Sequence, residues 1–140
     1  MSSKKKTVDL AAIDTVKGSN EGFDVQIYHP GTNEDLEISI SVLGKDSNAF
    51  QKVSRAQNKK RMTKMQKGGF RNVATVPIEE IEQDGIDLLA ACTTGWTGIM
   101  IDGKEIAFSK DNAVMIYERF PWVKEQVDTA IGDRANFINS

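Results

Sequence analysis

The sequence predicts an α+β protein: an N-terminal antiparallel β-hairpin, a basic helix, and then a helix, a second β-hairpin and two more helices. Two features of the hydrophobic pattern support this prediction. Apolar and polar side chains alternate over residues 23–28 and 36–42, and an Asp-Gly turn within 96–108 places most apolar side chains of that stretch on one face, which is the pattern of strands with one buried face. After each of these stretches, apolar residues recur three or four positions apart, which is the period of helices with one buried face.

Length and composition are those of one soluble domain. The chain has 140 residues and a formal net charge of −2, with 39% hydrophobic and 27% charged residues, so it can build a core. Residues 1–8 are polar and rich in lysine, and we expect a disordered tail there. The single domain predicted over 9–140 divides into a β-rich half (9–47), a basic helix with a linker (48–74) and a helix–hairpin–helix half (75–140).

The N-terminal hairpin is expected from two alternating stretches joined by a turn. Apolar residues alternate over 23–28 and 36–42, and residues 30–33 between them are turn formers. After the second strand, Asp46 or Ser47 can cap a helix by accepting hydrogen bonds from its first free amides.

Residues 48–67 have helix propensity but no continuous apolar stripe, which is typical of a helix that projects from a protein, bridges two parts of it, or is buried only at its ends. We expect Gly68 and Gly69 to end it. Positive charge is concentrated here, in Lys52, Arg55, Lys59, Lys60, Arg61, Lys64, Lys67 and Arg71. No acidic residue lies between Asp46 and Glu79, so charges of one sign occupy one stretch and the opposite sign follows.

The next helix is expected to begin at Pro77, with Glu79 and Glu80 complementing the positive end of the helix dipole. Its apolar residues recur with helical spacing, and we expect them to form one buried stripe. The stripe consists of Ile78, Ile81, Leu88, Leu89 and Cys92.

The second hairpin is expected over 96–109, because Asp102-Gly103 is a preferred pair for a two-residue turn with positive φ. This turn pairs Ile101 with Lys104, Ile99 with Ile106, and Thr97 with Phe108. Ser109 then caps a helix whose stripe is Ala113, Ile116, Tyr117 and Phe120. Pro121 interrupts it, and a last helix carries Val123, Val127, Ile131 and Phe137.

The residue types that enzymes and metal sites need are scarce. His29 and Cys92 are the only histidine and cysteine in the sequence, whereas a structural zinc site needs about four such ligands. His29 precedes a turn, and Cys92 ends an apolar run typical of inert packing. Phosphate-loop and dinucleotide motifs are absent, as are a secretory signal and a membrane-spanning run. We therefore expect a non-enzymatic protein with no catalytic residues, metal, cofactor or membrane partner.

The stretch Trp96–Ile106, followed by Phe108–Ala113, resembles the tail assembly chaperones of long-tailed bacteriophages. The ending Pro121–Asp128 with Asp133–Phe137, and Gly44–Ser47 after the alternating strand, are similar to the same family. The resemblance covers roughly residues 9–139.

The resemblance implies a chaperone of the bacterial host cytoplasm. Such proteins bind the tape measure protein, keep its apolar helical segments from aggregating and help the tail tube to assemble, which makes the tail tube protein a second partner. They are often made in a short form and a longer frameshifted form, and an end at Ser140 is expected for the short form. The alternative within the same system is a structural subunit of the virion tail.

Large aromatic side chains near the second hairpin are the candidate partner-binding residues, since aromatics with a polar handle are enriched in interface hot spots. The alternative is that they fill the core. The candidates are Trp96, Tyr117, Phe120 and Trp122.

The basic segment 52–71 allows three interpretations. It is a solvated surface, or it contacts the acidic segment 79–87 of another copy, or it binds the phosphates of a nucleic acid. Self-association would pair Lys59, Lys60 and Arg61 with Glu79, Glu80 and Glu82 of a neighbour. The linker between the two segments also allows the same pairing within one chain.

Overall fold

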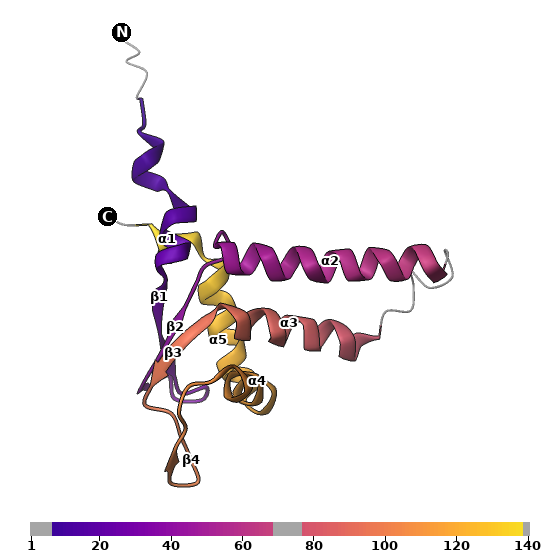
Figure 1. Cartoon of the computed structure of the whole chain (residues 1–140). Coiled ribbons are helices and arrows are strands. Elements are labelled where there is room, and N and C mark those ends of the chain that lie inside the picture. Colours follow the sequence, from indigo (N-terminus) through magenta and orange to yellow (C-terminus); the bar gives the residue numbers. More distant parts are fainter. Residues whose placement is uncertain (1–6, 69–76, 139–140) are drawn as a thin grey trace.

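The structure is a computed structural model that describes residues 7–68 and 77–138, and it has the predicted α+β fold (Figure 1). The expected tail over 1–8 lies outside the described residues except for its last two positions. The helical elements are η1 (Leu10–Ile13), α1 (Thr15–Glu21), α2 (Asn48–Gly68), α3 (Ile78–Cys92), α4 (Lys110–Arg119), α5 (Pro121–Gly132) and η3 (Arg134–Phe137). The strands are β1 (Phe23–Tyr28), β2 (Asp35–Val42), β3 (Thr93–Thr97), β4 (Met100–Ile101) and β5 (Lys104–Glu105).

The N-terminal hairpin is confirmed, and it belongs to a larger sheet than the sequence indicated. β1 pairs with β2, and β3 pairs with the other edge of β2, all antiparallel. The pairing of Thr97 with Phe108 is therefore wrong, because Thr97 lies opposite Ser39 of β2. At Gly98 (φ 85°) the chain leaves this sheet, and an added Cβ would lie 2.6 Å from the carbonyl oxygen of Glu37.

The second hairpin is confirmed over its turn. β4 and β5 form a separate two-stranded ribbon in which Ile101 pairs with Lys104. Ile106 N donates to the carbonyl oxygen of Ile99 at 2.9 Å. Asp102 and Gly103 have φ values of 52° and 78°, as the predicted turn requires.

The core lies between the inner face of the three-stranded sheet and the helices α4 and α5. Figure 1 shows α5 running alongside the sheet with α4 at its lower end. The fully buried side chains of this core come from β1, β2, α4, α5 and the end of α3, and they include Ile27, Ile40, Val42, Cys92, Ile116, Val127 and Ile131. Gln126 of α5 also covers the edge of β1, since its side-chain amide bonds to both the N–H and the carbonyl of Tyr28.

The C-terminal turn differs from the prediction. The last helix ends at Gly132, and Phe137 lies on η3 instead, although its side chain is buried against Phe23 at a ring distance of 5.9 Å. Here η3 packs on α1, a helix that the sequence analysis did not predict. Gly18 of α1 allows this approach, because an added Cβ would overlap the carbonyl oxygen of Phe137.

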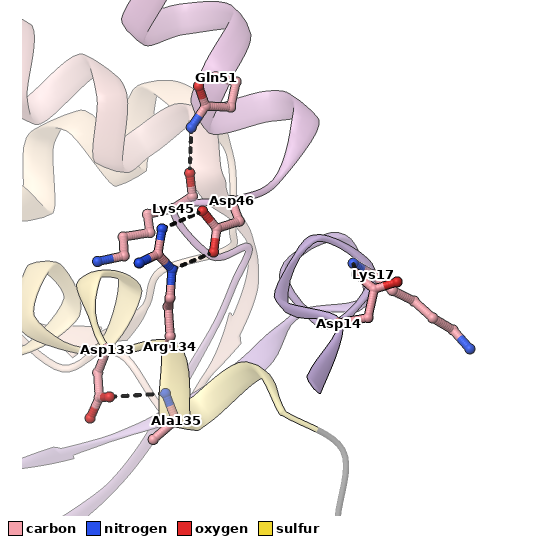
Figure 2. A network of polar contacts seen from close by, with 8 residues as sticks. All are labelled: Asp14, Lys17, Lys45, Asp46, Gln51, Asp133, Arg134 and Ala135. Carbon is pink, nitrogen blue, oxygen red and sulfur yellow. Dashed lines mark hydrogen bonds and ion pairs between the residues drawn. The ribbon is translucent and has the colours of Figure 1, made fainter. Parts of the chain in front are cut away.

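Charged side chains tie this turn to the start of α2 (Figure 2). Arg134 donates two hydrogen bonds to the carboxylate of Asp46, at 2.7 and 3.0 Å. Arg134 lowers the pKa of Asp46 from 3.8 to about 2. Of the two cap candidates, Ser47 is the cap: its Oγ accepts from Phe50 N at 3.2 Å.

α2 and the first half of α3 extend together from the rest of the molecule (Figure 1). We call residues 57–68 and 78–85 the arm, and the other elements the body. The expected buried stripe of α3 is wrong in the arm, where Ile78 and Ile81 are 70% and 50% exposed, and right in the body, where Leu89 and Cys92 are buried. The reason is that α3 faces α2 through polar side chains and reaches apolar neighbours only in its second half.

Candidate partner-binding site

A small apolar cavity lies between the second hairpin, β2 and the junction of α4 with α5. Its volume is about 110 Å³. The lining side chains are Ile38, Ile99, Met100, Ile101, Ile116, Phe120, Trp122 and Val123. A larger open groove between α1 and α2, lined mainly by polar residues, includes Asp46, Gln51 and Arg55. The apolar cavity is the better site for an apolar partner, since its surface is mostly apolar and binding there would desolvate little polar surface.

The helix junction places two aromatic rings at this cavity. Pro121 cannot continue α4, so α4 ends at Arg119, and Phe120 lies between it and the first turn of α5. Phe120 and Trp122 then flank the proline, and their rings meet edge to face at 6.4 Å. The guanidinium of Arg119 lies 5.2 Å from the centre of the Phe120 ring. Ring contacts of this kind restrict the orientation of the aromatic side chains.

The four predicted aromatic residues have different places in the structure. Phe120 and Trp122 line the cavity and are half-buried. Trp96 is half-buried too, but its Nε1 donates to the carbonyl oxygen of Ile106 (2.8 Å) and its ring contacts Phe108, so it anchors the hairpin to the sheet.

Tyr117 is a correction. Its side chain is 1% exposed, so it cannot contact a partner at the surface. The hydroxyl lies 2.7 Å from Thr93 Oγ1, and burial raises the Tyr117 pKa to about 12. The alternative stated for it, a place in the core, is correct, because it fills the space between α4 and the end of α3.

Sequence reasoning missed the hairpin side of the cavity. Met100 is 62% exposed at its rim, while Ile99 is buried and Ile101 is half-buried. The alternation over the hairpin assigned the isoleucines to the core and gave Met100 no role. An available signal was a large apolar residue on the outer side of a strand next to a tight turn.

Cys92 and His29, the two residues considered for catalysis, have different environments in the structure. Cys92 is buried, and burial raises its pKa to about 11. His29 Nδ1 accepts the N–H groups of Gly31 and Thr32, both at 3.0 Å, within the first turn. Over residues 7–68 and 77–138, histidine, cysteine, aspartate and glutamate form no group of three or more that could hold a metal ion. None of the helices in this part of the chain is long and apolar enough to cross a membrane.

The charged residues considered for self-association are partly paired inside the chain. Arg61 donates to Asp84 at 2.9 Å, and Lys64 donates to Glu80 at 2.6 Å, which lowers the Glu80 pKa. Arg61 and Glu80 thus have partners in the arm itself, which corrects their assignment to a contact between copies. The remaining residues of that set, Lys59, Lys60, Glu79 and Glu82, are exposed.

Comparison with known proteins adds no relative. The chain matches no protein-family model, no curated protein and no solved structure.

Proposed function

We propose that this protein is a non-enzymatic tail assembly chaperone of a long-tailed bacteriophage, which binds the tape measure protein and promotes assembly of the tail tube. The observation that supports it best is the apolar cavity with Met100 exposed at its rim. The resemblance of residues 96–137 to that family supplies the identity of the client, and the cavity supplies a place where an apolar client can bind.

The size and chemistry of the cavity suit one side chain of an apolar helix. An apolar cavity of about 150 Å³ is large enough to hold benzene, so the volume of about 110 Å³ found here fits a leucine or isoleucine side chain. Trp122 and Phe120 offer broad apolar contact at low entropic cost, as hot-spot aromatics do. Met100 adds a flexible side chain that adapts to different partners.

The test is co-purification of the tape measure protein with the full chain after co-expression in bacteria. Met100→Glu places a charge at the mouth of the cavity, and because Met100 is 62% exposed we expect the variant to fold as wild type does. We expect Met100→Glu, and Trp122→Ala as an independent variant, to weaken binding by about tenfold or more. Leu10→Glu is the matched control, since Leu10 is an exposed apolar residue on η1. Full binding by folded Met100→Glu and Trp122→Ala would contradict the proposal.

Two alternative functions, a structural tail subunit and a nucleic-acid-binding protein, can be distinguished from a chaperone by experiment. A structural tail subunit would be found by mass spectrometry in purified phage particles, whereas a chaperone would be absent from them. A nucleic-acid-binding protein would bind DNA or RNA with a steep salt dependence through cations such as Lys52, Arg55 and Lys59.

A further inference from the structure

A row of polar contacts fixes how the two helices of the arm face each other. Gln57 Nε2 donates to the carbonyl oxygen of Asp84 (2.8 Å), and Arg61 donates to its carboxylate (2.9 Å). Lys64 donates to Glu80 at 2.6 Å. Higher residue numbers on α2 contact lower residue numbers on α3, so the two helices are antiparallel. They lie side by side in Figure 1.

Each of these facing residues is followed by an uncharged one. The next residue of a right-handed helix is turned by about 100°, and in two antiparallel helices that face each other this turn leads to the same side of the pair. The residues in these positions are Asn58, Met62 and Met65 on α2, and Ile81 and Gly85 on α3, with Ile78 one turn before Ile81. We call these residues the uncharged face of the arm.

The uncharged face is open and mostly apolar. Met62 and Met65 of α2 are 61% and 39% exposed. Ile78 and Ile81 of α3 are 70% and 50% exposed. A Cβ added at Gly85 would meet no atom within 4 Å. Exposed apolar side chains that gather in one place indicate an interaction surface.

Charges on the outer edges of the arm indicate what covers this face. Lys59 lies two positions before Arg61, on the edge of α2 away from α3, and Glu82 lies two positions after Glu80, on the edge of α3 away from α2. Among the described residues, neither side chain forms an ion pair. α2 contains no acidic residue, so within the described part of the chain Lys59 lies without an acidic partner at one edge of the arm, and Glu82 lies without a basic partner at the other.

We propose that the uncharged face binds the same face of a second copy of this chain. A two-fold axis parallel to the arm lays α2 of each copy over α3 of the other. Met62 and Met65 of one copy then cover Ile78 and Ile81 of the second copy. Lys59 of the first copy comes to the same edge of the dimer as Glu82 of the second. A second copy supplies this complementary pattern of charge by symmetry. A two-fold axis across the arm would instead lay α2 over α2 and bring Lys59 of both copies to the same edge.

Sedimentation of the full chain tests the proposal, and wild type is expected to be a dimer. Met65→Glu and Ile81→Glu each bury a charge in the apolar interface, so each should raise the dimer Kd more than about 100-fold. Both positions are exposed in the single chain, so the melting temperature of the monomeric variants should stay that of a folded protein. Leu10→Glu is the matched control and should leave the dimer intact.

Charge reversal at the edges tests the arrangement of the copies. Lys59→Glu should raise the Kd about 3- to 10-fold, and adding Glu82→Lys to it should restore wild-type association. A wild-type chain that is monomeric at all concentrations, or a dimer that survives Met65→Glu and Ile81→Glu, would overturn the proposal. Tighter association of Lys59→Glu would overturn the stacking of α2 on α3. These readouts need no client, so they stand apart from the test of the proposed function.

Discussion

The body and the arm use the same kinds of residue for opposite purposes. In the body, isoleucines such as Ile40 and Ile131 are buried between the sheet and α5. In the arm, Ile78 and Ile81 are exposed, while the charged residues Arg61 and Asp84 lie between the helices. An apolar stripe of helical period therefore marks a surface that can be buried, and the neighbouring element decides whether it is buried within the chain.

The largest expected effect is the loss of folding stability when a core side chain of the body is shortened. Ile40→Ala removes a fully buried side chain from β2 and should lower the free energy of unfolding by about 2–5 kcal/mol. Met62→Ala in the arm should change it by less than about 0.5 kcal/mol, since that side chain is mostly exposed in the single chain. Urea unfolding at a concentration where the chain is monomeric measures both, and equal losses would refute the division into body and arm.

The second prediction concerns the contact that closes the arm. Arg61→Met leaves the largely covered carboxylate of Asp84 without its partner, and we expect the arm to open at a cost of about 1–2 kcal/mol. Hydrogen exchange should become faster over 57–68 and 78–85 and stay unchanged in β1 and β2. Lys64→Met is the matched control with a smaller effect, because the Lys64 side chain is more exposed. Faster exchange throughout the body would show that the two parts unfold together.

The third prediction concerns the hairpin that forms one wall of the cavity. Gly103→Val places a β-branched side chain at a φ of 78°, and it should cost on the order of 1 kcal/mol. Space is not the reason, because a Cβ at Gly103 meets nothing within 4 Å. An unchanged melting temperature would show that the turn tolerates the substitution and that the hairpin adds little to the stability of the body.

The smallest expected effect is the pH dependence of the Asp46–Arg134 pair. The folded-state pKa of Asp46 is about 2 against an ordinary 3.8, so the unfolded chain takes up a proton first as the pH falls. The pair stabilises the protein fully above about pH 4 and loses this contribution as the pH falls toward 2. We expect only about 1 kcal/mol, since Arg134 is mostly exposed. Asp46→Asn should remove this part of the pH dependence of the free energy of unfolding. If the variant and wild type lose stability in the same way between about pH 4 and pH 2, the Asp46–Arg134 pair is not the cause of that loss.

Sequence patterns correctly predicted the parts of the fold that depend on interactions between residues close together in the sequence. Strict alternation located β1 and β2, Asp102-Gly103 located the turn of the second hairpin, and Ser109 was correctly predicted to cap α4, with its Oγ accepting from Asn112 N.

The misses all depend on contacts between distant residues. β3 contains one large apolar residue, Trp96, so its pairing with β2 left no alternation to detect. α1 has no apolar stripe and is fixed by the approach of Gly18 to Phe137. The exposure of Ile78 depends on which side of α3 faces α2, and the sequence of α3 does not contain that information.

The candidate site was half predictable for the same reason. Phe120 and Trp122 flank a helix-breaking proline, which is a local signal for aromatics at a surface junction. Met100 joins them only because the second hairpin folds back toward that junction, which no local pattern indicates.

The central claim is that the body, at the cavity beside the second hairpin, captures the apolar client. Quantitative co-purification of the tape measure protein with Met100→Glu and with Met65→Glu tests it directly, since both variants place a glutamate at an exposed methionine, one in each region. We predict that Met100→Glu loses about nine-tenths or more of the client, while Met65→Glu retains it. Retention by Met100→Glu together with loss by Met65→Glu would contradict the claim and assign client capture to the arm.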